Sequence, residues 1–372
     1  MSAVQSIRLT PNFGTQEFKE FLAYCAKSNA SDIVLQTGDK IWAEIHGRQI
    51  SVTERTMKDG ELKSLLAQMF GNEILGVIKA GTDADRPYRF VTQDQNDATL
   101  RFRVNISSAQ VGDAEDGISV TMRTIPEQPP VLEKLALPAD ITNNLFQPRG
   151  MVLVCGPTGS GKTTLMSSFY AHVSETMGDV KILLYEDPIE FLFARVKNLG
   201  PRIRQMQVGQ HIQSFAAGLR NAMRCKPTLI GIGEARDQET INTLVEAALT
   251  GHGAYATMHT ETVSETISRA IQAFPPDQHS AIASKILGAI RLIVVQILVP
   301  TLDGKRAAVR ERLYFDQGIR REMSEMPYTQ WGAYLRKVVE QKGQHMAAGL
   351  HVLRERGLID DKAYRRYAGE VI

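Results

Sequence analysis

Residues 156–163 read Gly-Pro-Thr-Gly-Ser-Gly-Lys-Thr and carry the spacing G-x-x-x-x-G-K-[ST]. An apolar run at residues 151–155 precedes them, and a helix-compatible run at residues 164–173 follows. A strand, a glycine-rich loop and a helix in this order form a phosphate-binding loop. The glycines let backbone N–H groups turn inward, and the helix N-terminus adds positive potential. The sequence therefore predicts a nucleoside triphosphate as the ligand.

Two side chains of this loop are expected to carry its chemistry. Lys162 should reach the β- and γ-phosphates, and the Thr163 hydroxyl should ligate Mg²⁺. ATP and Mg²⁺ are therefore the expected cofactors. The residues expected to bind the nucleotide are Gly156, Pro157, Thr158, Gly159, Ser160, Gly161, Lys162, Thr163 and Thr164.

The composition of the 372 residues is that of an ordinary globular protein, with 43% hydrophobic and 23% charged residues. A net charge of +2 does not demand a nucleic-acid partner. The first residues lack the apolar core of a signal peptide, and the three cysteines have no metal or redox spacing. The most apolar segment, 286–299, is interrupted by Arg291 and Gln296 and is too short to span a bilayer. We therefore expect a cytoplasmic chain that associates with a membrane only through partners.

The pattern of apolar residues predicts four segments. Residues 1–124 combine amphipathic helices with short alternating strands, as in a small α+β domain. Residues 125–148 form a proline-rich linker and entry segment that suits a hinge. In residues 149–320 buried strands alternate with helices, which implies an α/β fold with a mostly parallel sheet and ligands at the carboxyl ends of its strands. Residues 321–372 are charged and helical.

Polar clusters follow three of the predicted strands of the second domain. The first, Tyr-Glu-Asp-Pro-Ile-Glu at residues 185–190, places three carboxylates after an apolar run. Carboxylates beside a phosphate site suggest a role in binding Mg²⁺ or water, and Glu186 is the candidate. The alternative is a helix N-cap around Pro188.

The second cluster, Leu-Ile-Gly-Ile-Gly-Glu-Ala-Arg-Asp at residues 229–237, delivers Glu234 at the end of a strand, where a Walker B acid belongs. Gly233 stands where P-loop proteins usually have an aspartate, so Mg²⁺ would depend more on Thr163, phosphate oxygens and water, with help from Glu186. Glu234 is expected to orient and polarise the attacking water. The alternative is a surface ion pair of Glu234 with Arg236 or with another base.

The third cluster, residues 250–260, has a histidine on each side of one short strand, His252 and His259. His259 could hydrogen-bond the γ-phosphate or the catalytic water and so report the nucleotide state. Lone histidines are usually structural, which is the alternative. Metal binding is the weakest option, because no third ligand stands at a suitable spacing.

The order of these motifs is more specific than each motif alone. The set GPTGSGKTT, YEDPIEF, LIGIGEARD and TGHGAYATMHT resembles the secretion-ATPase superfamily, which includes type II and type IV secretion motors and pilus retraction motors. Walker B in that superfamily likewise reads Gly-Glu, so Gly233 is no departure from it. The resemblance implies a RecA-like P-loop ATPase domain, a small PAS-like α+β domain before it, a helical C-terminal tail and assembly into a hexamer.

The first domain supports this resemblance. Residues 30–38 and 44–48 look like the amino-terminal domain of those motors, and the strand arginines Arg101, Arg103 and Arg123 match theirs. In the superfamily such arginines reach the γ-phosphate within one chain or across a subunit boundary, and the resemblance assigns that role here. The alternative is that they form salt bridges with Asp or Glu on the sheet.

Residues 124–130, 247–252 and 299–301 narrow the resemblance to the DotB ATPases of type IVB (Dot/Icm) secretion and the related conjugative TraJ ATPases. This implies a hexameric ATPase that is recruited to the cytoplasmic face of the inner membrane by the proteins of a secretion or conjugation complex. One alternative is a type IV pilus retraction motor, and another is a nucleotide-gated scaffold with little turnover. A RecA-like nucleic-acid translocase is disfavoured, because the charge is near neutral and no aromatic-basic stripe is present.

Overall fold

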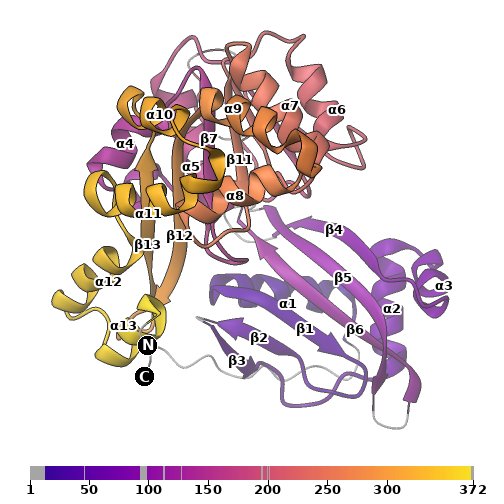
Figure 1. Ribbon diagram of the computed structural model, residues 1–372. Coiled ribbons are helices and arrows are strands. Elements are labelled where there is room, and N and C mark those ends of the chain that lie inside the picture. Colours follow the sequence, from indigo (N-terminus) through magenta and orange to yellow (C-terminus); the bar gives the residue numbers. More distant parts are fainter. Residues whose placement is uncertain are drawn as a thin grey trace. The chain divides into compact units, whose positions relative to one another are not determined.

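The computed structural model describes residues 13–45, 47–92, 99–111, 114–126, 128–193, 196–198, 200 and 202–369, with the side chains of residues 114 and 115 excepted. His46, part of one motif above, and Glu127 of the proline-rich linker lie outside this set. The chain divides into two compact units, Met1–Glu127 and Gln128–Ile372 (Figure 1).

The first unit is an antiparallel sheet with helices on one face. The strand order is β3-β2-β1-β6-β5-β4. Apolar side chains of the helices and of alternate strand positions form one core. Its elements are α1 (Thr15–Lys27), β1 (Ala30–Gln36), β2 (Trp42–Ile45), β3 (Arg48–Ser51), α2 (Asp59–Phe70), α3 (Glu73–Lys79), β4 (Ala84–Val91), β5 (Thr99–Val111) and β6 (Ala114–Ile125).

Alternation along β5 and β6 decides which side chains leave this core. Phe102 and Met122 are fully buried under the helices, and their neighbours Arg103 and Arg123 point to the opposite face of the sheet, since successive side chains of a strand alternate. Arg101 shares that face. The sequence pattern thus places all the predicted arginines on the face that the helices of this unit leave uncovered.

The second unit is a sheet with strand order β13-β12-β7-β11-β10-β8-β9. All neighbours pair in parallel except β12 and β13, which form an antiparallel pair at the edge. The expected α/β fold class is therefore confirmed. The elements are η1 (Leu132–Leu135), α4 (Ala139–Leu145), β7 (Gly150–Cys155), α5 (Lys162–Thr176), β8 (Ile182–Glu186), β9 (Arg204–Gln207), α6 (Phe215–Ala222), β10 (Leu229–Ile232), α7 (Gln238–Leu249), β11 (Gly253–Met258), α8 (Val263–Gln272), η2 (Pro276–Gln278), α9 (His279–Ala289), β12 (Ile290–Pro300), β13 (Arg306–Tyr314), α10 (Gln317–Ser324), η3 (Tyr328–Gln330), α11 (Trp331–Lys342), α12 (Met346–Glu355) and α13 (Asp361–Ala368).

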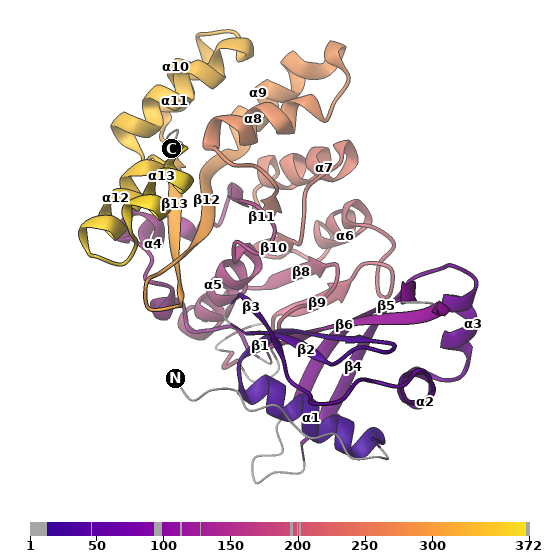
Figure 2. The same cartoon turned by 90° about the horizontal axis from the view of Figure 1, so that it is seen from below.

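Helices cover both faces of this sheet (Figure 2). On one face α5 and α4 pack against alternate residues of β7, β8 and β11, with Phe169, Tyr170 and Tyr255 in ring contact. On the other face α6 to α11 pack against the remaining strand residues. The central strands are buried on both sides, which explains why they read as unbroken apolar runs in the sequence.

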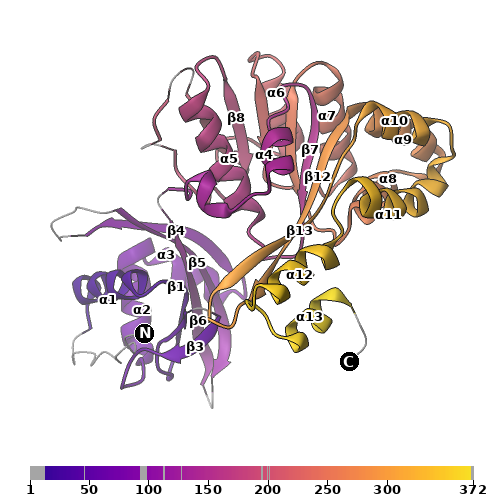
Figure 3. The ribbon, with the colours of Figure 1, turned by 90° about the vertical axis from the view of Figure 1, so that its left-hand side faces the viewer.

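The C-terminal helices pack onto the second unit (Figure 3). Met323 of α10 and Trp331 of α11 lie in the core shared with α7 and α9. Leu350 of α12 and Ile359, between α12 and α13, pack against Val299 of β12 and Val309 of β13. Asp360 caps α13 by accepting the Ala363 N–H. Within the described ranges, no helix combines the length and apolar character that crossing a bilayer requires.

Candidate functional site

Strands β7, β8, β10 and β11 run in parallel, so their carboxyl ends lie at one edge of the sheet. The predicted clusters follow these strands directly: the phosphate loop after β7, Glu186 at the end of β8, Glu234 after β10 and His259 after β11. The fold therefore gathers at one edge side chains that lie far apart in sequence.

Backbone angle favours glycine at two positions of the phosphate loop, and at Gly156 space also requires it. Gly156 has φ +139°, and a Cβ there would lie 2.1 Å from the carbonyl oxygen of Gln296. Gly161 has φ +83°, and a Cβ there would lie 3.0 Å from Nε2 of Gln296. A side chain at position 156 would push the loop away from β12, and one at position 161 would crowd the Gln296 side chain. The loop thus lies directly against that strand, with α5 beginning at Lys162.

Lys162 is buried at the base of the loop. Its Nζ donates hydrogen bonds to the carbonyl oxygens of Gly156 at 2.8 Å and Pro157 at 2.9 Å. Burial lowers the pKa of Lys162, because the charged form is desolvated, whereas the carboxylates of Glu234 and Glu190 act in the opposite direction. The ammonium group is therefore within electrostatic reach of Glu234, which follows β10.

Glu186 ends β8 as a mostly buried carboxylate. Its Oε2 accepts a hydrogen bond of 2.8 Å from Nε2 of Gln205, which lies on the edge strand β9. The backbone of Glu186 lies against Gly233, where a Cβ would be 3.4 Å from its Cα. No helix begins at Pro188, so the helix-cap alternative for this cluster is wrong.

Glu234 sits in a turn that β11 holds in place. The Thr257 hydroxyl donates to the carbonyl oxygen of Gly233, and the Thr257 carbonyl accepts the Ala235 N–H at 2.9 Å. From this turn Oε1 of Glu234 lies 3.6 Å from Nε2 of His259. Oε2 lies 4.0 Å from Arg236, so the surface ion pair considered from the sequence is present only as a long contact.

The two histidines that flank β11 lie at opposite ends of it. His252 precedes the strand, and its Nδ1 lies 3.2 Å from the carbonyl oxygen of Ala247, which makes it part of the turn after α7. His259 follows the strand with its side chain 40% exposed. Only His259 is therefore placed where a bound phosphate could be contacted.

The metal-binding capacity of this edge is small. In the parts of the chain that the structure describes, no group of three or more His, Cys, Asp or Glu side chains could hold a metal ion. The donors that the sequence predicts for Mg²⁺ at this edge are the Thr163 hydroxyl and the Glu186 carboxylate. Such a set fits Mg²⁺, which usually keeps several waters and takes phosphate oxygens together with one or two protein ligands.

The predicted arginines lie on the first unit, and two of them are engaged with aspartates there. Arg103 and Arg123 face each other across β5 and β6, an arrangement that like charges oppose. Each has an acidic neighbour: Nε of Arg103 donates to Asp85 at 2.8 Å, and Nε of Arg123 donates to Asp32 at 2.9 Å. The salt bridges considered as the alternative therefore exist, and a role toward phosphate stays a prediction.

Three residues beside the site were not identified as functional candidates from the sequence. Thr257 holds the turn that carries Glu234, and Gln296 and Arg310 lie behind the phosphate loop. In the sequence, Gln296 stands out as a polar residue within an apolar run. Nothing in the sequence marks Arg310 as buried, because its burial depends on the pairing of β12 with β13.

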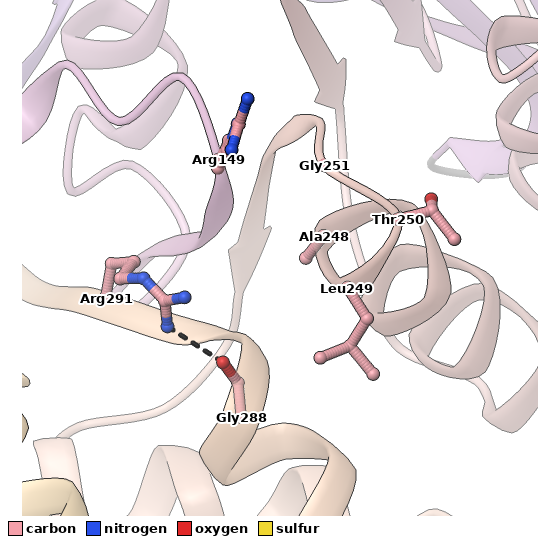
Figure 4. A pocket seen from close by; sticks show the side chains of 7 residues that line it. All are labelled: Arg149, Ala248, Leu249, Thr250, Gly251, Gly288 and Arg291. Atoms are coloured by element: carbon pink, nitrogen blue, oxygen red, sulfur yellow. Dashed lines mark hydrogen bonds between the residues drawn. The ribbon is translucent and has the colours of Figure 1, made fainter.

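A separate hollow of about 520 Å³ lies at the amino ends of the parallel strands, where β7, β11 and β12 begin. Arg149, Gly251 and Arg291 are among its lining residues (Figure 4). Arg291 donates to the Gly288 carbonyl across one side of it at 2.9 Å, and Arg149 points away from Arg291. None of the predicted site residues lines this hollow.

Comparison with known proteins places this geometry in a family. The family of type II/IV secretion system proteins matches residues 16–352. The chain belongs to this family. The match spans both units, so it covers the arginine-bearing sheet as well as the phosphate loop.

Solved structures of related ATPases resemble the whole of this secretion-family chain. The Legionella pneumophila ATPase DotB has 36% sequence identity and a TM-score of 0.92, with 98% of this chain and 99% of DotB covered. The pilus retraction motor PilT, solved with bound ADP, has 28% identity and a TM-score of 0.78, with 94% and 96% covered. A twitching motility protein of Neisseria gonorrhoeae is 31% identical, with 93% of this chain and 91% of that protein covered. The predicted superfamily is thereby confirmed: this chain is an ATPase of the secretion and pilus family and resembles DotB.

Proposed function

We propose that this chain is a hexameric ATPase that couples ATP hydrolysis to type IVB secretion or conjugative transfer. The likeness to DotB carries the proposal, because a TM-score of 0.92 extends over 98% of the chain. It thus includes the C-terminal helices, which carry none of the shared motifs. In this role the chain acts at the cytoplasmic face of the inner membrane, bound to proteins of a secretion or conjugation complex and not directly to nucleic acid.

Hydrolysis in this proposal is an in-line attack of water on the γ-phosphate. The loop from Gly156 to Thr164 binds the phosphates through its backbone N–H groups. The ammonium group of Lys162 exchanges its two carbonyl partners for phosphate oxygens. Glu234 orients the attacking water, and His259, 3.6 Å from Glu234, contacts the water or the γ-phosphate.

Positive charge completes the proposed chemistry. Bound Mg²⁺ would neutralise charge on the phosphate oxygens, held by the Thr163 hydroxyl and, directly or through water, by Glu186. Arg101, Arg103 and Arg123 would stabilise the charge that develops on the γ-phosphate, as arginine fingers do. Loss of that phosphate would remove these contacts, and the linker at residues 125–138 would then serve as the hinge.

Mass measurement of the purified full chain tests the assembly part of this proposal. A hexamer should form with a non-hydrolysable ATP analogue and Mg²⁺, and the Lys162→Ala variant should form less of it at the same analogue concentration. A strict monomer at high protein concentration in both conditions would contradict the proposal.

A type IV pilus retraction motor is the second candidate function. The gonococcal twitching motility protein and the PilT structure favour it, since both likenesses also extend over more than nine-tenths of this chain. Deletion of the gene separates the two candidates. Loss of effector or plasmid transfer with normal twitching supports the secretion or conjugation role, and loss of twitching with normal transfer supports retraction.

A further inference from the structure

Two buried polar side chains lie behind the phosphate loop. Gln296 on β12 and Arg310 on β13 stand directly opposite each other in the antiparallel pair, and their side chains are 3% and 6% exposed. Burying an amide and a guanidinium group in an apolar edge of a sheet costs stability unless their hydrogen bonds are satisfied. Because burying polar groups is costly, we expect Gln296 and Arg310 to have a function beyond packing.

The hydrogen bonds of this pair run from the phosphate loop to the start of the second unit. Nε2 of Gln296 donates to the carbonyl oxygen of Ser160 at 2.6 Å. Its Oε1 accepts from Nε of Arg310 at 2.7 Å, and Nη2 of Arg310 donates to the carbonyl oxygen of Leu135 at 3.2 Å. Leu135 belongs to η1, which comes shortly after the boundary between the two units.

The contact at Ser160 acts on the part of the loop that would face phosphate. The peptide group between Ser160 and Gly161 is planar and trans, so its carbonyl and its N–H point in opposite directions. Gln296 holds the carbonyl from the side of β12, and the Gly161 N–H is thereby turned toward the interior of the loop. The glycine at 161 permits this, because a Cβ there would lie 3.0 Å from Nε2 of Gln296.

Arg310 determines which end of the Gln296 amide faces the loop. A guanidinium group only donates, so the amide oxygen must turn to Arg310 and the amide nitrogen to Ser160. Burial lowers the pKa of Arg310 to about 10, and the nearby Arg312 acts in the same direction. Because a pKa of about 10 lies well above neutral pH, the guanidinium group still carries its charge there. Among the described residues Arg310 forms no ion pair with a carboxylate, which leaves its charge to polarise Gln296.

We propose that Gln296 and Arg310 are positioning residues of the phosphate loop, and that they transmit its occupancy to η1 at Leu135. When a phosphate oxygen accepts the Gly161 N–H, the Ser160 carbonyl becomes a stronger acceptor, and the hydrogen bonds through Gln296 and Arg310 tighten in turn. This inference rests on the ATPase activity of the family and is independent of whether the chain serves secretion, conjugation or retraction.

Nucleotide affinity of substituted full-length chains tests the positioning role. Gln296→Leu removes the donor to Ser160 and should raise the Kd for a fluorescent ADP analogue about 5- to 20-fold, as expected for one lost buried hydrogen bond. Gln296→Glu keeps the partner of Arg310 and turns a carboxylate oxygen toward the Ser160 carbonyl. It should weaken binding more than Gln296→Leu while melting closer to the wild type.

A matched control is available in the same unit. Nε2 of Gln147 donates to the Asn144 carbonyl at 2.9 Å, near the amino ends of the parallel strands and away from the phosphate loop. Gln147→Leu should therefore change the melting temperature and leave the Kd within about twofold of wild type. A structural role alone would make the losses of affinity follow the losses of melting temperature. Kd values within twofold of wild type for both Gln296 variants would overturn the proposal.

Hydrogen exchange of the wild-type chain tests the transmission without any substitution. Addition of ADP should slow amide exchange at residues 132–136 together with exchange in the phosphate loop. In Gln296→Leu saturated with ADP, the loop should still be protected and residues 132–136 should not. If ADP protects the loop of the wild type and leaves exchange at residues 132–136 unchanged, the coupling to η1 does not exist.

Discussion

Replacing Thr257 with valine should disturb the position of Glu234 without changing the shape of the core. Thr257 is buried on β11, and its hydroxyl and carbonyl hold the residues on both sides of Glu234. Valine has nearly the same volume, so the substitution removes one hydrogen bond and leaves the Gly233 carbonyl without that donor.

The size of the effect follows from that single lost contact. A buried acceptor left unpaired costs about 1–3 kcal/mol of the free energy of unfolding. In a unit of this size that corresponds to a fall of roughly 3–8 °C in melting temperature. Because Glu234 would move by a fraction of an ångström, kcat for ATP hydrolysis should fall on the order of tenfold, with the nucleotide Kd nearly unchanged.

Two control variants make this prediction specific. Thr257→Ser keeps the hydroxyl and should retain kcat. Thr243→Val removes another buried hydroxyl, one that donates to the Glu239 carbonyl within α7 at 2.8 Å, and should leave kcat at the wild-type value. Thermal melting and steady-state phosphate release measure both effects. If Thr257→Val keeps wild-type kcat, or if Thr243→Val lowers it equally, Thr257 does not position Glu234.

Three further predictions concern single side chains. Cys25 and Cys155 are fully buried, and burial raises the pKa of both thiols, to about 12 for Cys25, whereas Cys225 is half-buried. The native chain should therefore react with a thiol reagent first at Cys225, and equal rates at all the cysteines would contradict the buried placement. The Tyr255 hydroxyl accepts the Gln147 N–H at 2.7 Å and donates to the Leu145 carbonyl at 2.9 Å. Tyr255→Phe should lower the free energy of unfolding by about 1–3 kcal/mol in a urea titration, and an unchanged midpoint would argue against this hydrogen-bonded cluster. Glu234→Gln should lower phosphate release on the order of 100-fold while ADP still binds, and wild-type activity no higher than that of the variant would favour a nucleotide-gated scaffold.

The edge that carries the site was predictable because local patterns determine it. Unbroken apolar runs predicted the buried strands. The alternation of strands with helices predicted a parallel sheet with Lys162, Glu234 and His259 at the carboxyl ends of its strands. The sequence likewise predicted amphipathic helices within residues 1–124, and α1 (Thr15–Lys27) is one of them. The chemical roles of the site residues remain predictions.

The support behind the site was not predictable, because it depends on pairing between distant segments. The register of β12 with β13 brings Gln296 opposite Arg310, and neither residue alone indicates this. Similarly, the sequence predicted helices in residues 321–372 without indicating what they pack against. Only the fold places Met323 and Trp331 in the core of the second unit.

The pairing of Arg103 and Arg123 with aspartates is compatible with two different roles for these arginines. The resemblance to the superfamily indicated their strand positions, but the aspartates that pair with Arg103 and Arg123 lie on neighbouring strands and were not identified from the sequence. An arginine held by an aspartate can be purely structural, or it can be kept in place for a phosphate.

The most direct measurement compares kcat for ATP hydrolysis and nucleotide Kd in Arg103→Ala and Arg89→Ala. Arg89 lies on β4, directly opposite Arg101 and on the same face of the sheet, so its loss removes a similar charge. We predict that Arg103→Ala lowers kcat on the order of 10³-fold and changes the Kd only a few-fold, and that Arg89→Ala changes neither by more than about threefold. Equal losses of kcat and affinity in Arg103→Ala, or equal losses in the two variants, would contradict the account.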